Sequence, residues 1–427
     1  MLDDPHSHGL WERSAPPAPT TTELVDELTV DVVIVGAGYT GLSAALHLAE
    51  AGVKTAVLEA TAIGFGGAGR NVGLINAGMW VMPDDLPGVL GPVYGERLLD
   101  LLGNAPRLVM EIIERHGIDC ELTRNGTLHL AVGDKGLKEI EDRARQWQAR
   151  GAPVVLLDAA ETERRVGSRS YTGALLDKRA GTLQPLAYAR GLAKSALAAG
   201  AAIFTASPVT EAIRKDRHWQ VATPKGHVTA QWVIVATDAY STGPWERVRT
   251  EQVHLPYFNL ATQPLSDNLR RSILPGLEGA WDTKEVLSSF RLDKAGRLVF
   301  GSVGALRNSG KMIHPAWAKR AMHKLFPQLG DTNFDYQWYG KIGMTVDALP
   351  RFHRFDQNVI GFSGYNGRGI APGTVFGRTL AEHILGQRLE GDLPLPVSDV
   401  NEPAFRTLKE IWYEAGAQIA HMADSRL

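Results

Sequence analysis

Three glycines, Gly36, Gly38 and Gly41, follow the spacing G-x-G-x-x-G. Such a turn brings backbone N–H groups close to a diphosphate. Gly36 permits the tight bend, Gly38 the close approach of the backbone, and Gly41 the packing of a following helix. The N-terminus of that helix adds partial positive charge at the same point. The pattern alone is weak, because glycine-rich turns are common, so its value depends on the elements around it.

A strand, a helix and a second strand must position these glycines. Residues 30–35 are apolar except for Asp31 and predict a parallel strand buried on both faces, which Thr29 extends by one residue. A helix over 41–50 and a strand over 55–58 follow. Glu59 ends the second strand about 20 residues past the glycines, where a carboxylate binds the adenosine ribose and disfavours a 2′-phosphate. This context favours a bound dinucleotide over an empty turn.

Later segments extend the same pattern. Residues 232–236 and 358–362 are similar to the first strand, and we expect them in the same sheet. Alternating apolar and polar residues between 257 and 303 predict antiparallel strands of a second domain. The fold class is therefore α/β, mixed with α+β, in which a Rossmann-type domain and an antiparallel-sheet substrate domain are interleaved along the chain.

Composition narrows the class of protein. The 427 residues carry a net charge of -2 and no basic block, so nothing favours nucleic acid or an anionic membrane as a partner. No apolar run approaches the ~20 residues of a transmembrane segment, and the first residues do not form a secretion signal. The single cysteine, Cys120, cannot form a disulfide or a multi-thiolate site, and we expect no metal. We expect a cytoplasmic protein and leave peripheral contact with the inner membrane open.

Residues 64–73 resemble the G-x-G-A-S-G-R-N-x-G stretch of the D-amino-acid oxidase superfamily, in its glycine/sarcosine oxidase and γ-glutamylputrescine oxidase branch. The departure in this stretch is mild: Gly67 and Ala68 stand for Ala and Ser. In the later stretches Asp238 stands for Asn, Val346 for Pro and Arg368 for His. The matches run in family order over nearly the whole chain, and together they indicate FAD. The further matching stretches are 180–185, 235–240, 338–340, 345–350 and 364–369.

The resemblance implies dissociable FAD and a set of residues that contact it. Cys120 lies far from the segment where sarcosine oxidases attach flavin, and no His occurs between Glu59 and Gly78, where histidyl-linked relatives carry one. Val209, after an expected strand at 201–204, is implied to contact the adenine through its backbone. The implied FAD contacts are Gly36, Gly38, Tyr39, Thr40, Gly41, Glu59, Ala60, Gly66, Gly67, Arg70, Asn71, Val72, Gly73, Leu74, Val209, Ala236, Thr237, Gly340, Gly364, Asn366, Gly367, Arg368, Gly369 and Ile370.

The expected domains are discontinuous. We assign 1–28 to an N-terminal arm; 29–85, 155–245 and 338–395 to the Rossmann-type FAD-binding domain; 86–154 and 246–337 to the substrate domain; and 396–427 to a C-terminal helix. In that last helix the apolar residues repeat at helical spacing and predict a stripe packed on the body of the protein. A helix that binds a partner or a membrane surface is the alternative. The stripe comprises Phe405, Leu408, Trp412, Ala415, Ile419 and Met422.

The resemblance also implies the chemistry. Bound FAD takes a hydride from a carbon next to nitrogen and leaves an imine, and the amine must be neutral when the hydride departs. An amino-acid substrate needs a cation for its carboxylate, and arginine suits it best. The candidates are Arg291, Arg368 and Lys341, and Tyr257 is a candidate for the pocket wall; a surface arginine at 291 and a core aromatic at 257 are the alternatives.

Within the family, the stretch 70–80, the opening Leu-Trp-Glu at 10–12 and the loop 364–369 most resemble bacterial L-pipecolate oxidase. We therefore expect oxidation of a secondary amine or imino acid, with L-pipecolate favoured and oxygen or a respiratory acceptor as oxidant. A γ-glutamylputrescine or glycine/sarcosine-type oxidase and a quinone-linked amine dehydrogenase are the alternative enzymes. A flavin-binding module without catalysis is the non-enzyme alternative.

Overall fold

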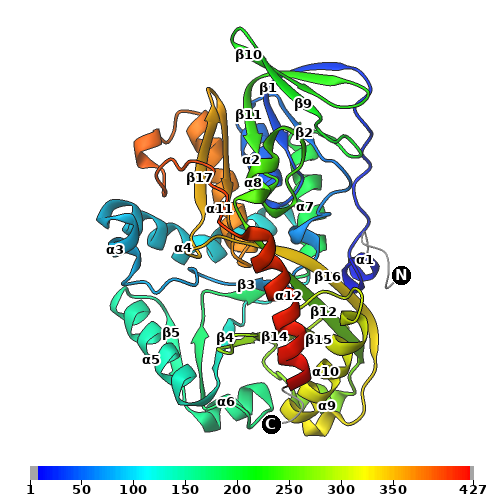
Figure 1. The fold of residues 1–427 in the computed structure, drawn as a ribbon, viewed down its shortest axis with the longest axis vertical. Helices are drawn as coiled ribbons and strands as arrows, with labels where there is room; N and C mark the ends of the chain where they lie inside the picture. The colour runs from blue at the N-terminus through cyan, green and yellow to red at the C-terminus, as the bar shows by residue number, and fades with distance from the viewer. Residues whose placement is uncertain (1–7, 424–427) are drawn as a thin grey trace.

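Two eight-stranded β-sheets organise residues 8–423, the part of the chain that the computed structural model describes (Figure 1). The sheets stack end to end along the long axis of the molecule. A short third sheet pairs β3 (Leu74–Ile75) with β7 (Gly181–Thr182) between them. No helix within 8–423 has both the length and the apolar character needed to cross a bilayer.

The first sheet is the predicted Rossmann-type sheet. Its path runs β17-β18-β11-β1-β2-β8, with a β9–β10 hairpin attached to β11. The inner strands pair in parallel, as buried runs such as Val32–Ile34 favour. The placement of 232–236 and 358–362 in one sheet with the first strand is confirmed. The strands are β1 (Glu27–Val35), β2 (Thr55–Leu58), β8 (Ala202–Phe204), β9 (Glu211–Lys215), β10 (His218–Ala222), β11 (His227–Val235), β17 (Arg351–Asp356) and β18 (Val359–Ser363).

Helices cover this sheet and fix its glycine turn. α2 (Tyr39–Glu50) follows β1 and lies between α7 (Pro185–Ala198) and α11 (Ile370–Ile384), and α4 (Pro92–His116) packs against α11. The remaining helices are α1 (Leu10–Ser14), α3 (Leu86–Leu90), α5 (Gly133–Ala149), α6 (Ala159–Val166), α8 (Glu246–Thr250), α9 (Asp267–Ser272), α10 (Gly310–Leu325) and α12 (Arg406–Ala423).

The second sheet has the order β16-β12-β15-β14-β13-β4-β6-β5, antiparallel except where β13 pairs with β4. Alternate residues such as Leu130, Phe258 and Phe300 pack with α10 in one apolar core. Because side chains alternate along a strand, the residues between them point to the opposite face, toward the first sheet. The strands are β4 (Thr127–Ala131), β5 (Val154–Leu157), β6 (Gly173–Asp177), β12 (Val253–Pro264), β13 (Gly279–Asp282), β14 (Ser288–Leu292), β15 (Arg297–Val303) and β16 (Phe334–Met344).

The sheets divide the chain differently from the predicted ranges. Strands β5 and β6, which we assigned largely to the FAD-binding range 155–245, belong to the second sheet, where β6 pairs with both β5 and β4. Strand β16 enters the range 338–395 but pairs with β12. These short strands carry apolar patterns that fit either sheet, and only pairing across the fold separates them.

Both ends of the described chain differ from the predicted N-terminal arm and packed C-terminal helix. In the predicted N-terminal arm, Leu10 and Trp11 are buried, and the Trp11 ring packs on Trp338 with centroids 5.3 Å apart. At the other end the C-terminal helix forms as α12, but the prediction that its apolar stripe packs on the body is wrong. Leu408 is 63% exposed and Trp412 71% exposed, because α12 docks through its polar side chains instead.

Candidate functional site

The turn between β1 and α2 has the geometry of a diphosphate cradle. Gly36 has φ +106°, and a Cβ there would lie 2.8 Å from the carbonyl oxygen of Ala236. A Cβ at Gly41 would lie 2.0 Å from the carbonyl oxygen of Gly36, so both positions require glycine. Gly38 caps α2 with no side-chain hydrogen bond, and a Cβ there would find its nearest neighbour, the Cβ of Ala68, at 3.9 Å. Open space thus faces an uncapped helix N-terminus, which suits an anion.

Glu59 closes the same turn from the end of β2. One carboxylate oxygen accepts the N–H of Ala37 at 2.8 Å, and the other accepts the N–H of Thr61 at 2.9 Å. Burial raises the pKa of Glu59, and these backbone N–H groups oppose the rise by stabilising the carboxylate. Ala60 follows directly, and Val209 packs among buried residues of this sheet. The carboxylate therefore lies beside the cradle, where an adenosine ribose would reach it.

The stretch 64–73 forms a loop held in place by its own polar side chains. The Nε of Arg70 donates to the carbonyl oxygen of Phe65 at 2.9 Å. The amide of Asn71 donates to the carbonyl oxygens of Gly67 and Ala68 at 3.0 Å each, and its oxygen accepts the N–H of Gly73 at 2.9 Å. The loop contains Gly66 and Val72 and leads directly into Leu74 of β3. It is thereby fixed as a wall beside α2.

The stretch 364–370 supplies a second uncapped helix N-terminus. The N–H of Gly364 donates to Asp238 at 2.8 Å, and Asn366 accepts the N–H of Thr345 at 2.8 Å. Gly369 caps α11 without a side-chain hydrogen bond, and a Cβ there would meet no atom within 4 Å. The turn therefore presents backbone N–H groups to open space, as a flavin ring with its polar edge would require.

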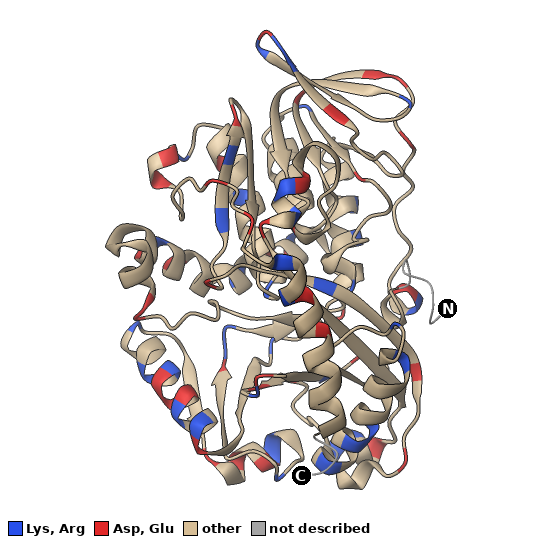
Figure 2. Ribbon diagram, viewed as in Figure 1, with Lys and Arg blue, Asp and Glu red and all other residues tan. Residues whose placement is uncertain are grey.

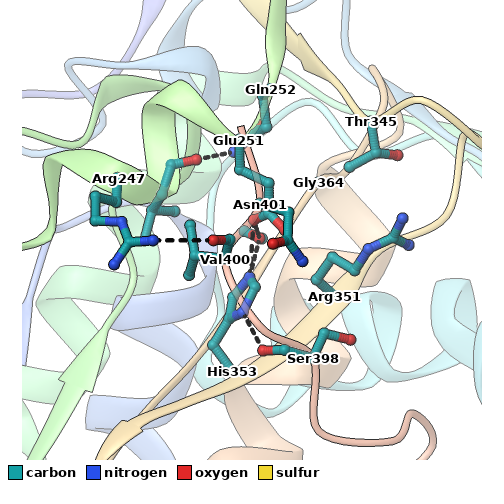
Figure 3. A network of polar contacts seen from close by, with 12 residues as sticks. Arg247, Glu251, Gln252, Thr345, Arg351, His353, Gly364, Ser398, Val400 and Asn401 are labelled. Atoms are coloured by element: carbon teal, nitrogen blue, oxygen red, sulfur yellow. Dashed lines mark hydrogen bonds and ion pairs between the residues drawn. The ribbon is translucent and has the colours of Figure 1, made fainter. Parts of the chain in front are cut away.

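A buried contact between a histidine and a carboxylate supports this turn from behind (Figure 3). His353 of β17 lies 2.9 Å from the Glu251 carboxylate and 3.0 Å from the Ser363 hydroxyl, and its other nitrogen contacts the Ser398 carbonyl oxygen at 2.8 Å. Within the described residues no group of three His, Cys, Asp or Glu side chains could hold a metal ion. His353 thus serves the packing around Gly364.

The remaining implied FAD contacts lie at these walls. Ala236 and Thr237 follow β11 directly, and Ala236 contacts the glycine turn. Gly340 lies in β16, where a Cβ would come within 3.1 Å of the Arg70 side chain. Ile370 begins α11, and Gly367 precedes it. Two uncapped helix ends, a glycine loop and a buried carboxylate therefore fit an extended dinucleotide such as FAD.

The surroundings of Arg291 differ from those expected of a substrate ligand or of a surface arginine. It is fully buried, and its guanidinium donates to the carbonyl oxygens of Leu183 and Leu292 and lies 3.7 Å from Glu121. The guanidinium also lies 5.8 Å from the ring of Trp11. These contacts occupy the planar guanidinium and favour a structural role. We therefore no longer expect Arg291 to bind the substrate carboxylate.

Tyr257 and Lys341 lie one register step apart in the paired strands β12 and β16, with their side chains on opposite faces of the sheet. Tyr257 is half-buried on the inner face of the second sheet, where its hydroxyl and that of Ser289 lie 2.6 Å apart, and desolvation of the hydroxyl raises its pKa. Lys341 is exposed on β16, and its pKa is lowered by partial burial and by the nearby Arg249 and Arg307. Tyr257 therefore remains a wall residue, and Lys341 lies toward the surface.

Arg368 lies in an aromatic box that the sequence did not reveal. Its guanidinium carbon is 4.6 Å from the Trp80 ring and 4.9 Å from the Trp281 ring, and the two rings meet edge to face at 5.2 Å. His129 stacks on Trp281 at 3.5 Å. Trp281 and His129 are register partners in β13 and β4, next to Ser289 of β14. Period-two alternation in these strands was the signal that could have found them.

The box is rich in hydrogen-bond donors. Arg143 from α5 donates to the carbonyl oxygens of Met79 and Trp80. Among the described residues, the buried Nε of Arg368, Nε1 of Trp281 and Nδ1 of His129 have no hydrogen-bond partner. Burial, reinforced by the charge of Arg143, lowers the pKa of Arg368 to about 9, and burial holds the pKa of His129 well below its usual value. A buried guanidinium with an unmatched donor is suited to a carboxylate.

Comparisons with known proteins agree with this geometry. A sequence profile described as FAD dependent oxidoreductase, DAO, matches residues 31–383. Gamma-glutamylputrescine oxidoreductase of Escherichia coli K12 is 34% identical over 429 residues, which cover 98% of each chain. Glycine oxidase of Geobacillus kaustophilus is 24% identical and covers 85% of this chain and 95% of its own. The crystal structure of that organism's glycine oxidase has a TM-score of 0.69 at 20% identity, over 84% of this chain and 95% of its own.

Proposed function

The chain belongs to the DAO family of FAD-dependent oxidoreductases, as an enzyme that acts on amine donors, and we propose that its substrate is a secondary amine or imino acid whose carboxylate binds Arg368. The observation that carries the proposal is the unmatched Nε of Arg368 inside the box of Trp80 and Trp281. A planar guanidinium binds a carboxylate at two points, and the two indole rings exclude water around that contact.

The same groups prepare the amine for oxidation. FAD, when bound, supplies the acceptor for the hydride that leaves the carbon next to nitrogen. The cation of Arg368 and the apolar rings both disfavour a second positive charge, so the substrate amine is held in its neutral form. Tyr257 and Ser289, joined through their hydroxyls, form the polar part of the wall on the second sheet. These residues orient the substrate and keep its nitrogen lone pair free.

L-Pipecolate is the favoured substrate within this class. Its ring is apolar and compact and carries one carboxylate beside the nitrogen, which matches an arginine between aromatic walls. γ-Glutamylputrescine is the second candidate, and the 34% identical relative from Escherichia coli supports it. The acceptor is oxygen or a respiratory quinone. A quinone-linked enzyme would reduce an artificial dye quickly and form hydrogen peroxide slowly with the same substrate.

An anaerobic flavin-reduction screen tests the proposal. L-Pipecolate, L-proline, sarcosine, glycine and γ-glutamylputrescine are added in turn, and loss of the oxidised flavin absorbance is followed. Piperidine, which is pipecolate without its carboxylate, is the matched control and should react on the order of 100-fold more slowly at low concentration. If γ-glutamylputrescine reduces the flavin faster than L-pipecolate does, γ-glutamylputrescine is the substrate instead. Failure of the whole panel, or equal rates for piperidine and pipecolate, would refute the proposal.

A further inference from the structure

The C-terminal helix α12 is docked with its polar side inward. Glu414 forms two hydrogen bonds with the guanidinium of Arg307, and Glu410 accepts the backbone N–H of His254 at 3.1 Å. Near the end of the helix the ring of His421 stacks on Trp317. Figure 1 shows α12 crossing the front of the molecule, over the second sheet and beside α10. The carboxylates of α12 are thus turned toward the body of the protein.

The opposite side of α12 is apolar and faces solvent. Within this helix Lys409 is the exposed charged residue, because Arg406, Glu410 and Glu414 are partly buried. In Figure 2 the helix is tan over its C-terminal half. The large apolar side chains that are exposed on α12 and at its start are Phe405, Leu408, Ile411, Trp412, Tyr413, Ile419 and Met422.

Such a surface is unusual for a folded chain. A continuous row of exposed Leu, Ile, Phe and Trp side chains marks a site that another apolar surface covers. In this protein other long helices bury apolar residues against each other: α4 packs against α11, and α11 packs against α2. The exposed row on α12 therefore calls for an occupant outside the described chain.

The size and charge of the surface favour a lipid bilayer over a second copy of the chain. A stable protein interface takes ~20–30 residues from each partner, far more than the exposed row on α12 offers. Lys409 lies on the row, Lys341 lies near Glu410, and Arg320 donates to the backbone of His421 at the far end. Exposed cations beside an apolar row that contains Trp and Phe are typical of a helix that lies in the headgroup region of an anionic membrane.

We propose that α12 binds the surface of a bilayer that contains anionic lipid, with its apolar row among the headgroups and its polar side on the protein. This proposal is independent of the substrate of the enzyme. It also replaces the expectation, drawn from net charge, that nothing favours an anionic membrane. The chain as a whole carries -2, but Lys409, Lys341 and Arg320 are exposed around α12, while Glu410 and Glu414 are partly buried on its polar side.

Sedimentation of the full-length holoenzyme with vesicles tests the proposal. Vesicles of phosphatidylcholine with phosphatidylglycerol should carry the protein into the pellet, vesicles of phosphatidylcholine alone should carry less, and high salt should weaken the binding. The double variant Leu408→Asp, Trp412→Asp should reduce the bound fraction by about tenfold or more, because both carboxylates would have to enter the interface. Val89→Asp, at another exposed apolar side chain, is the control and should bind like the wild type.

Each outcome of the vesicle experiment either supports or overturns membrane binding by α12. The flavin absorbance and Tm of the double variant should equal those of the wild type, since both side chains are exposed, and this shows that the fold is retained. Absence of wild-type binding to phosphatidylglycerol vesicles overturns the proposal, as does equal binding of the double variant. A dimer seen by sedimentation velocity without lipid, and lost in the double variant, would assign the row to a second copy of the chain.

Discussion

Gly38→Ala should separate cofactor binding from folding. Gly38 is the N-cap of α2, with φ -87° and ψ -172°, which alanine adopts without strain. A Cβ there would lie 3.9 Å from its nearest neighbour, in ordinary van der Waals contact. The new methyl group would project into the open space before the helix N-terminus. If a diphosphate occupies that space, the methyl group and the phosphate cannot both fit.

Gly38→Ala should change the free energy of unfolding little and the affinity for FAD strongly. Alanine has fewer conformations than glycine in the unfolded chain, which stabilises the fold by ~0.4–1 kcal/mol. Alanine is also a poorer N-cap than glycine, which costs ~0.5–1 kcal/mol, so the net change in the free energy of unfolding is below about 1 kcal/mol. For binding, displacement of the phosphate from two backbone N–H groups loses charge-assisted hydrogen bonds of ~1.5–3 kcal/mol each. The dissociation constant of FAD should therefore rise by roughly 100- to 10,000-fold.

The assay is titration of the FAD-free protein with FAD, followed by flavin fluorescence, together with the Tm of the FAD-free protein. Gly88→Ala is the control, because a Cβ at Gly88 meets no atom within 4 Å in a helix away from the site. Gly41→Ala should instead lower the Tm, since its Cβ would lie 2.0 Å from the carbonyl oxygen of Gly36. Unchanged FAD affinity in Gly38→Ala would refute the placement of the diphosphate, and a loss of Tm like that of Gly41→Ala would refute the steric argument.

Three further predictions concern single side chains, and a fourth concerns the flavin linkage. Arg368→Lys should raise the KM for a carboxylate substrate about 100-fold, because lysine lacks the planar fork. Glu59→Gln should weaken FAD about tenfold in the same titration, since an amide is a weaker acceptor for the ribose hydroxyls and for the N–H of Ala37. Burial lowers the pKa of His314 to about 4 and of His421 to about 3, so both rings are neutral in the folded protein at neutral pH. Their contribution to the free energy of unfolding is complete above pH 6.5 and is lost as the pH falls toward 4, because the unfolded chain then binds protons that the buried rings do not. His421→Phe should therefore make the Tm less dependent on pH between 6.5 and 4. Acid precipitation should leave the flavin in the supernatant; yellow colour in the pellet would contradict dissociable FAD.

The nucleotide-binding half could be predicted from the sequence because its signals are local. The strand expected at 30–35 lies within β1, the helix expected from 41 begins at Tyr39, and the strand expected at 55–58 matches β2. In that segment a glycine spacing, an apolar strand and a carboxylate fall within about 30 residues, as one βαβ unit requires. Each of these signals is visible without knowledge of distant contacts.

The substrate side could not be predicted in the same way. Trp281 and His129 meet because β13 pairs with β4 across some 150 residues of sequence, and no spacing reports that pairing. Arg291 has the residue type of a substrate ligand, but its neighbours Leu183 and Glu121 show what it binds. Arg368 is identified from its loop, but the pairing that brings Trp281 and His129 to it is not visible in the sequence. Tertiary pairing decides which side chains share a pocket.

The C-terminal helix shows a different limit of prediction from sequence. Its apolar period is genuine and predicts an amphipathic helix, which α12 is. The period gives the width of the apolar stripe but not its direction. Glu410 and Glu414 find cationic and backbone partners on the body, so the polar side is turned inward and Trp412 outward.

The order of strands in the first sheet has a consequence for biosynthesis. β1 lies between β2, which follows it closely, and β11, which begins at His227. The wall at Ala236 and the turn at 364–370 thus leave the ribosome long after the glycines at 36–41, and a nascent chain cannot enclose its cofactor early. FAD must be captured by a nearly finished polypeptide, where it stabilises the folded form by mass action. The riboflavin supply of an expression host should therefore govern the yield of folded enzyme.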